Sequence, residues 1–392
     1  MKISIETKVL QDLTSKAIKG SGRNSLIPFT LGINIEVVGT DLILTTTDNV
    51  NTLKVIGKDT CSAQSSGFFT CVDSDTFSRL VAKTTSKIIT LENTETALKV
   101  KGNGEYSLEV MADKYNNNEI ARIPELPFDD AVAVSGELDL KVLADVLNYN
   151  KLNISKTADA GQVYTGYYVD KESVVTYNGA ATITMSKLIT GDDFSPMVLP
   201  YNLVELMSII PGNTATIKCE SNKIKVVSDD IEIVGALLNN TVENEDGTTQ
   251  SLFRADKLKE FTNVVGVSSC VVSKSEILDV LDRLSIFVTS AFGVEEGIKL
   301  AFGSDKVIIS NIDKDGNSTN VEALDYKSSA DAVDYVKNIN WRLLRLQVNA
   351  CKENEIEMFY NSQKGLVINT GMIYQVLPYL VDYDASQIKV VR

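Results

Sequence analysis

The sequence predicts an α+β protein in which one unit of helices and antiparallel strands is repeated three times. Three segments each contain three strand-like runs, and an amphipathic helix precedes each segment. A longer helix opens each third of the chain. The predicted strand runs are 88–91, 97–100 and 106–110 in the first third, 216–219, 224–227 and 231–234 in the second, and 356–359, 366–369 and 373–376 in the third.

The helices are predicted from hydrophobic periodicity and from signals at their first residues. The short helices are expected at 74–83, 200–210 and 340–349, and the longer ones at 7–19, 137–150 and 273–287. Pro200 suits the first turn of its helix. Ser273 and Glu276 have the spacing of a capping box. Asp73 and Asp75 fit a helix N-terminus better than a metal site, because carboxylates there accept hydrogen bonds from free N–H groups.

Equivalent positions recur at similar distances along the chain. Leu10, Leu140 and Ile277 lie in the opening helices and are separated by 130 and 137 positions. Unrelated α+β domains in tandem would not be expected to agree in the order and length of their elements. We therefore expect three similar domains, 1–127, 128–250 and 251–392, the last with a C-terminal extension.

The composition is that of a globular protein with excess negative charge. Of the 392 residues, 44% are hydrophobic and 23% are charged, and the net charge is −14, so adhesion to nucleic acid by bulk charge is not expected. The absence of histidine removes the commonest general base and the Ser-His and Cys-His pairs. The five cysteines form no C-x-x-C pair, which predicts reduced, buried thiols. No apolar run reaches the length of a membrane span, and residues 1–6 alternate like a strand, so we expect a cytoplasmic protein without membrane contact.

Several short motifs do not support an enzyme. Residues 313–317 resemble a calcium loop, but their glycine is at the fourth position instead of the sixth, so a hairpin turn is expected. Gly102 and Gly104 lack the third glycine and the helix of a dinucleotide site. A metal-carboxylate enzyme would rest only on scattered pairs such as Asp192 and Asp193. We expect no catalytic residue, no metal and no cofactor.

Positive charge is concentrated in the predicted helices. The six helical segments, counted with their flanks, carry a net charge of +6, whereas the whole chain carries −14. Solvated helix faces are usually charged with mixed signs. Lys337, Arg342, Arg345 and Lys352 occur with no acid between them. This pattern favours helices that face phosphate groups.

The sequence resembles the bacterial-type sliding clamp family, the β subunit of DNA polymerase III. The resemblance covers essentially the whole chain and is carried by short stretches in matching order: 1–6, 26–31, 42–48, 198–207 and 374–380. It implies three similar DNA-clamp domains per chain and two chains closed head to tail into a dimeric ring. Helices would line the inner wall, with antiparallel sheets outside. The implied function is a processivity factor that encircles duplex DNA without reading its sequence.

The resemblance also implies three sets of site residues. The DNA contacts would be Lys19, Arg23, Arg79, Lys83, Arg342 and Arg345. A groove for short linear peptides of the polymerase, the clamp loader and repair proteins would comprise Tyr164, Tyr177, Thr182, Val264, Leu377, Pro378, Tyr379, Leu380 and Val381. The homodimer interface would pair Tyr106 and Leu108 of one chain with Ile286 and Phe287 of the other.

The chain departs from the family pattern around the groove. The usual Thr-Asp-Gly-x-Arg-Leu stretch is replaced at 177–182, and Leu380 stands where the family has a basic residue. Residues 382–392 extend beyond the usual end. The alternative is a clamp-like scaffold that binds replication proteins without encircling DNA, which the neutral or acidic segments 200–212 and 273–287 would suit.

Overall fold

A computed structural model describes residues 1–23, 26–113, 119–130, 134–139, 146–179, 182–187, 196–210, 214–220, 222–288, 297–312, 318–362 and 364–380. These residues form two compact units. Unit 1 comprises the described residues of Met1–Lys141 and Leu199–Leu238, and unit 2 those of Val142–Ile189, Ser195–Val198 and Asn239–Arg392. Each unit is described by itself.

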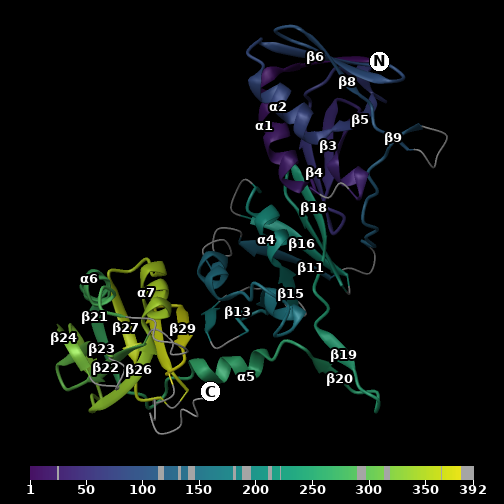
Figure 1. The fold of residues 1–392 in the computed structure, drawn as a ribbon. Coiled ribbons are helices and arrows are strands. Elements are labelled where there is room, and N and C mark those ends of the chain that lie inside the picture. Colours follow the sequence, from purple (N-terminus) through teal and green to yellow (C-terminus); the bar gives the residue numbers. More distant parts are fainter. Residues whose placement is uncertain are drawn as a thin grey trace, which may run out of the picture. The chain divides into compact units, whose positions relative to one another are not determined.

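Unit 1 begins with the predicted strand-helix pair and returns to strands after each helix (Figure 1). Its first elements are β1 (Lys2–Glu6), α1 (Thr7–Ala17), η1 (Ile18–Gly20), η2 (Pro28–Leu31), β2 (Gly32–Val38), β3 (Asp41–Thr47), β4 (Asn51–Gly57), η3 (Ala63–Ser65), β5 (Phe69–Asp73) and α2 (Ser74–Lys83). They are followed by β6 (Ile88–Asn93), β7 (Ala97–Lys101), β8 (Glu105–Glu109), β9 (Ala112–Asp113), β10 (Glu119–Ile120), β11 (Val134–Asp139), α4 (Tyr201–Met207), β16 (Thr214–Glu220), β17 (Lys223–Val227) and β18 (Ile231–Ala236).

Two antiparallel sheets carry α1, α2 and α4 in unit 1. One has the strand order β1-β6-β7-β8, and the other has the order β11-β16-β17-β18-β4-β3-β2-β5. The helices pack by narrow apolar faces, because Leu10 and Leu13 of α1 and Phe77 and Val81 of α2 are buried at helical spacing. The opposite faces of α1 and α2 remain exposed to solvent.

Unit 2 contains more strands and begins, in the described residues, with a helical turn at 146–150. Its next elements are η4 (Lys151–Asn153), η5 (Gln162–Thr165), β12 (Gly166–Val169), β13 (Ser173–Tyr177), β14 (Ile183–Lys187), β15 (Met197–Pro200), β19 (Thr241–Glu243), β20 (Thr249–Ser251), α5 (Ala255–Lys259) and η6 (Glu260–Thr262). The remainder is β21 (Ser269–Ser273), α6 (Lys274–Leu284), β22 (Gly297–Phe302), β23 (Lys306–Ile312), β24 (Ser318–Asp325), β25 (Ser328–Ala330), β26 (Tyr335–Asn340), α7 (Trp341–Ala350), β27 (Glu355–Phe359), β28 (Leu366–Thr370) and β29 (Ile373–Leu377).

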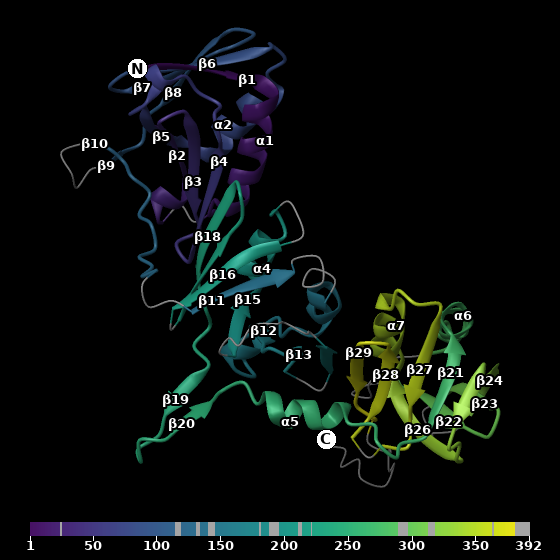
Figure 2. The same ribbon diagram turned by 180° about the vertical axis from the view of Figure 1, so that it is seen from behind.

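Unit 2 also has two main antiparallel sheets (Figure 2). Their strand orders are β15-β12-β13-β14-β29-β28-β27-β21-β25 and β24-β23-β22-β26. The core between the last sheet and helices α6 and α7 is apolar, with Ile277, Leu281 and Leu344 at most 1% exposed. A buried polar contact lies beside it: the side-chain amides of Asn153 and Gln347 exchange hydrogen bonds of 3.2 and 2.9 Å.

The same strand junction occurs once in each unit. Three strands that follow one another in the chain and pair in order, such as β16, β17 and β18, are here called a triplet. In unit 1, the last strand of this triplet, β18, pairs antiparallel with β4, and Ile233 faces Leu53. In unit 2, the last strand of another triplet, β29, pairs antiparallel with β14, and Val376 faces Ile183. The third triplet ends in β8. Among the described strands, β8 pairs only with β7 and β24 pairs only with β23. One triplet-ending strand, β8, and one hairpin strand, β24, are therefore left at sheet edges in the described structure.

Most of the predicted elements are confirmed. All nine strand runs fall on β6, β7, β8, β16, β17, β18, β27, β28 and β29, and α2 has the predicted bounds. Asp73 Oδ1 accepts a hydrogen bond from Thr76 N at 2.8 Å, and Ser273 Oγ accepts one from Glu276 N at 3.4 Å, so both predicted caps are present. The five cysteines are free, and four of them are buried.

Three helix predictions are wrong in their bounds. The helix expected at 273–287 spans only Lys274–Leu284, so Ile286 and Phe287 lie beyond its end. The helix expected at 137–150 is a strand at its start, because Val134–Asp139 pairs in register with β16. Pairing with a neighbouring strand here overrides the helical periodicity. Pro200 is the N-cap of α4 instead of a residue of its first turn, and α4 ends at Met207. Residues 192–193, 313–317 and 381–392 lie outside the described part.

Candidate nucleic-acid interface and peptide groove

The first basic surface of unit 1 lies where α1 ends. Lys19 on η1 and Arg23 in the following loop are both exposed. The loop is held by close packing: Gly22 N donates to Thr47 O at 3.0 Å, and a Cβ on Gly20 would lie 2.6 Å from neighbouring side chains. The two cations therefore project from a rigid base.

Arg79 and Lys83 lie on α2, which packs beside α1 (Figures 1 and 2). Gln11 on α1 donates to two backbone carbonyl oxygens near the end of α2, each at 3.0 Å. Arg79 Nη1 lies 3.3 Å from Asp75 Oδ2, but both side chains are about 70% exposed. Such a pair contributes little to stability and opens readily toward a phosphate.

The cations at this surface differ in how strongly they are neutralised. Among the described residues, no carboxylate forms an ion pair with Lys19, Arg23 or Lys83. Lys16 is different, since its Nζ lies 2.8 Å from Asp12 Oδ2. Unit 1 therefore presents three cations that are available for phosphate contacts.

The basic residues of unit 2 are less available. Arg345 on α7 donates from Nε and Nη2 to the two carboxylate oxygens of Asp282 on α6. These hydrogen bonds lower the pKa of Asp282. Arg342 is exposed, with its guanidinium carbon 5.7 Å from the centre of the Trp341 ring. The sequence analysis did not pair Arg345 with Asp282, because Asp282 lies on a neighbouring helix, 63 positions away in the chain.

Strand register gathers the predicted groove residues of unit 2 at one end of its large sheet. Tyr177 faces Ile183, which in turn faces Val376. Thr182 directly precedes Ile183, and Leu377 directly follows Val376. Thr182 and Leu377 are both 0% exposed, and Thr182 Oγ1 has no hydrogen-bond partner among the described residues.

An aromatic cluster adjoins this end of the sheet. Tyr164 on η5 packs edge-on against Tyr177, with ring centres 5.1 Å apart. Tyr164 also lies 5.0 Å from Phe253, whose ring stacks on Tyr168 at 5.1 Å. Phe253 and Tyr168 were not predicted. For Phe253, the signal available in the sequence was an aromatic residue two positions before the polar helix α5.

Tyr379 and Leu380 are directed toward the edge strand β26. The Tyr379 hydroxyl donates to Tyr360 O, and its ring centre lies 5.9 Å from that of Tyr335. Leu380 N donates to Asn338 O at 2.9 Å. Tyr379 therefore has a packing role in addition to any contact with a peptide.

Three predicted groove residues remain: Pro378, Val264 and Val381. Pro378 is half-buried next to Leu377. Val264 follows η6, a turn held against β14 because Thr262 Oγ1 donates to Met185 Sδ at 3.4 Å. Val381 lies outside the described residues.

Three of the four predicted dimer residues are exposed apolar side chains. Tyr106 is 46% exposed on the edge strand β8, and Leu108 on the same strand is half-buried. Ile286 and Phe287 follow α6 and are 76% and 48% exposed. Exposed large apolar residues next to an unpaired strand edge are typical of an interface between proteins.

Comparison with known proteins identifies the fold. No family model matches the sequence, and no curated protein matches it. The Bacillus subtilis DNA polymerase sliding clamp superposes with a TM-score of 0.79 at 16% identity, covering 98% of this chain and 100% of that one. The chain has the sliding-clamp fold. The sliding clamp of Caulobacter crescentus (TM-score 0.78, 14% identity, 97% of this chain and 100% of that one) and the Thermotoga maritima DNA polymerase III β subunit (0.77, 16%, 97% and 99%) agree.

The resemblance inferred from the sequence is thus confirmed at the level of the sliding-clamp fold. Within the described residues, helices accompany open antiparallel sheets, and no sheet closes into a barrel. Within the described part of this sliding-clamp fold, no helix is long and apolar enough to cross a membrane. No group of three His, Cys, Asp or Glu side chains in that part is arranged to hold a metal ion.

Proposed function

We propose that this protein is a DNA sliding clamp, a non-catalytic processivity factor that encircles duplex DNA and tethers a polymerase to it. The observation that carries the proposal is the sliding-clamp fold over 98% of the chain. Under this proposal the chain has three similar domains, 1–127, 128–250 and 251–392, and two chains form a closed ring.

The repeated strand junction supports ring closure. Pairs β18–β4 and β29–β14 join a triplet strand to a hairpin strand in the same antiparallel way. The remaining strands of these two kinds, β8 and β24, are at sheet edges in the described structure. Pairing β8 of one chain with β24 of a second would repeat the junction, and two-fold symmetry would make it occur twice.

Apolar side chains lie where this junction would form. Tyr106 and Leu108 are on β8, and Ile286 and Phe287 follow α6, which is tied to β24 by an ion pair between Arg283 and Glu322. Burying these four side chains would add hydrophobic stabilisation to the strand pairing. We therefore assign them to the dimer interface.

Enclosure explains why few cations are needed. Each neutralised phosphate adds salt-dependent binding free energy that must be lost again when the protein moves along DNA. A ring retains DNA by topology, so weak, sequence-independent contacts are sufficient. We assign this role chiefly to Lys19, Arg23 and Lys83, with smaller contributions from the other predicted cations: Arg79, Arg342 and Arg345.

The groove in unit 2 is the proposed site for polymerase and clamp-loader peptides. Tyr164 and Tyr177 provide aromatic surface, and Thr182 and Leu377 lie at the adjoining strand ends. Thr182 and Leu377 are fully buried and support this surface from beneath, so the contacts with a short apolar peptide segment would come from the tyrosines.

Mass in solution tests the ring interface. We expect twice the chain mass of 42.8 kDa by light scattering. Replacing Ile286 and Phe287 by lysine should give monomers, because two charges would have to be buried at each interface. Val265→Lys is the matched control, since Val265 is 89% exposed and lies outside the proposed interface. A dimer that survives the double substitution would contradict the assignment.

Retention on circular DNA tests encirclement. Rings reassembled from dissociated subunits around a nicked plasmid should remain on it through gel filtration at high salt. Linearising the plasmid should release them, because a ring slides off a free end. Equal loss from circular and linear DNA would instead support the scaffold that binds replication proteins without encircling DNA.

Salt dependence tests the DNA contacts. Lys19→Gln together with Arg23→Gln should reduce the slope of log affinity against log salt by about 2, one per lost phosphate contact. Arg345→Gln is the matched control and should change the slope less, because Asp282 already neutralises Arg345. Equal slopes for all three proteins would refute the assignment.

A further inference from the structure

A segment of unit 1, residues 121–130, crosses the face of the large sheet and is here called the strap. Its first part is anchored: the side chain of Ile123 is 3% exposed, and the Arg122 guanidinium carbon lies 3.8 Å from the centre of the Phe69 ring. Ile123 N also donates to Asn34 Oδ1 at 3.4 Å. The second part, Glu125–Asp130, lies over strands β4, β16 and β17.

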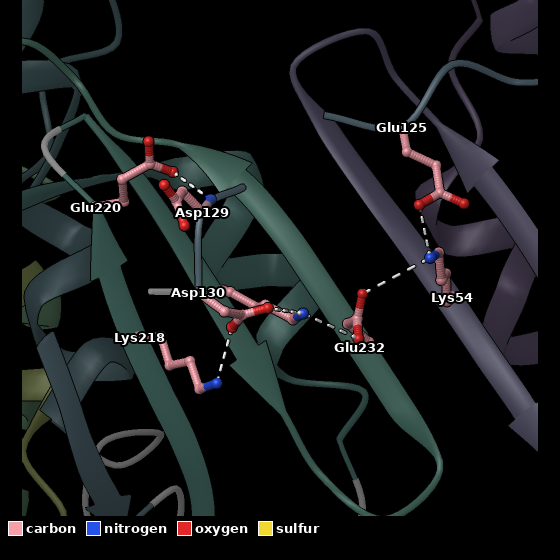
Figure 3. Close-up of polar contacts among 8 residues, drawn as sticks. Lys54, Glu125, Asp129, Asp130, Lys218, Glu220 and Glu232 are labelled. Carbon is pink, nitrogen blue, oxygen red and sulfur yellow. Dashed lines mark hydrogen bonds and ion pairs between the residues drawn. The ribbon is translucent and has the colours of Figure 1, made fainter. Parts of the chain in front are cut away.

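Four lysines on these strands contact the strap and are here called the lysine row, and Figure 3 labels two of them, Lys54 and Lys218. They are Lys54 on β4, Lys218 on β16, and Lys223 and Lys225 on β17. Each one binds the strap. Lys54 Nζ lies 2.7 Å from Glu125 Oε2, and Lys218 and Lys225 hold the two carboxylate oxygens of Asp130 at 2.7 and 3.2 Å. Lys223 Nζ donates to Pro127 O at 2.7 Å.

A cavity of about 350 Å³ lies between the strap and the sheet. The strap contributes Leu126, Pro127 and Phe128 to its wall, and Phe128 lies 5.9 Å from Lys225 Nζ. Leu126 and Phe128 are only half-buried. The cavity shows that the apolar centre of the strap does not fill the surface beneath it.

The positive charge of the lysine row exceeds the negative charge of the acidic side chains that the sheet places beside it. Glu232 on β18 is shared between Lys54 at 3.8 Å and Lys225 at 3.5 Å. Glu220 accepts a hydrogen bond from Asp129 N at 3.0 Å (Figure 3). Without the strap, four lysines would face the two carboxylates of Glu220 and Glu232, which leaves a positive strip on a protein of net charge −14.

The strap is held by contacts that water and salt weaken. The Asp130 and Glu125 side chains are 48% and 59% exposed. Hydrogen bonds from Lys218 and Lys225 lower the pKa of Asp130, so the carboxylate is charged at neutral pH. Exposed ion pairs are individually weak and are screened at physiological ionic strength. A segment held in this way can exchange with another of similar chemistry.

We propose that the lysine row is a docking strip for acidic peptides, which the strap occupies within the chain and a partner's segment occupies by displacing it. The matching partner chemistry is that of the strap: carboxylates on both sides of a short apolar and aromatic centre, as in Glu125–Asp130. This site lies wholly within unit 1, and the proposal does not depend on DNA binding.

The test uses a fluorescent peptide with the sequence of residues 124–130 and the full chain. A variant with Glu125→Gln and Asp130→Asn weakens the strap without touching the lysines. Fluorescence anisotropy should show at least about fivefold tighter binding of the peptide by this variant than by the wild type. The apparent affinity for the peptide is proportional to the fraction of molecules in which the strap has left the site, and the variant raises that fraction. Raising the salt concentration should weaken this binding.

Adding Lys218→Gln and Lys225→Gln to the strap variant should abolish binding, and a peptide with amides in place of its acids should not bind. Unchanged melting temperatures would show that the variants are folded. Equal binding by the wild type and the strap variant would overturn the proposal, as would binding that survives loss of both lysines. Binding of a single-stranded oligonucleotide in place of the peptide would overturn the choice of partner.

Discussion

Removing the buried amide pair of unit 2 should loosen the region where Asn153 meets Gln347. The two side chains are 2% and 0% exposed and exchange hydrogen bonds of 3.2 and 2.9 Å. Gln347→Ala removes both bonds, each worth about 1 kcal/mol, and leaves buried polar atoms of Asn153 without that partner, at a cost of about 1–3 kcal/mol. We expect a total loss of at least about 3 kcal/mol of local stability.

Hydrogen exchange measures this effect without assuming that the whole chain unfolds in one step. A loss of about 3 kcal/mol corresponds to roughly hundredfold faster exchange in peptides from η4 and α7. Asn349→Ala is the matched control, since Asn349 is an exposed residue of the same helix. In a double-mutant cycle with Asn153→Ala, the two single effects should not be additive. Additivity within about 0.5 kcal/mol would refute the reasoning.

Three further predictions concern local packing, capping and pH. Gly20→Ala should lower the melting temperature, because its Cβ would lie 2.6 Å from neighbouring side chains, whereas Gly303→Ala, with its nearest atom at 3.4 Å, should have little effect; equal effects would refute the steric argument. Asp73→Ala should cost about 1 kcal/mol in urea unfolding, and Asp73→Asn should cost less because it keeps a capping oxygen; equal costs would refute the cap. Burial raises the pKa of Asp170, but hydrogen bonds from Lys259 and the backbone outweigh it and hold the pKa below its ordinary value of 3.8. This stabilisation is present above pH 3.8 and is lost as pH falls through the lowered pKa, so the difference in melting temperature between wild type and Asp170→Asn should shrink below about pH 4; a constant difference from pH 3 to 7 would contradict it.

Local patterns in the sequence were sufficient to predict most elements. Alternation predicted all nine triplet strands, and the capping signals at Asp73 and Ser273 predicted two helix starts. The failure at 137–150 arose because pairing of Val134–Asp139 with β16 joins segments about 80 positions apart, and periodicity within one segment carries no information about such a partner.

The candidate site shows the same limit. Charge clustering identified the basic helices but could not show that Asp282 neutralises Arg345. Apolar residues of the groove were assigned by resemblance, and strand register brings Tyr177, Thr182 and Leu377 to one sheet end. Phe253 was missed because its neighbours, Tyr164 and Tyr168, are distant in sequence.

The edges of β8 and β24, which have no neighbouring strand in the described part of the chain, have a consequence for assembly. Under the proposed pairing of β8 with β24 of a second chain, the contact is head-to-tail, and it closes into a ring only if the rotation per chain suits a full circle. A small change in sheet twist would convert the same contact into an open, growing filament. A lone subunit, for its part, exposes backbone N–H and C=O groups that can recruit unrelated strands and start aggregation.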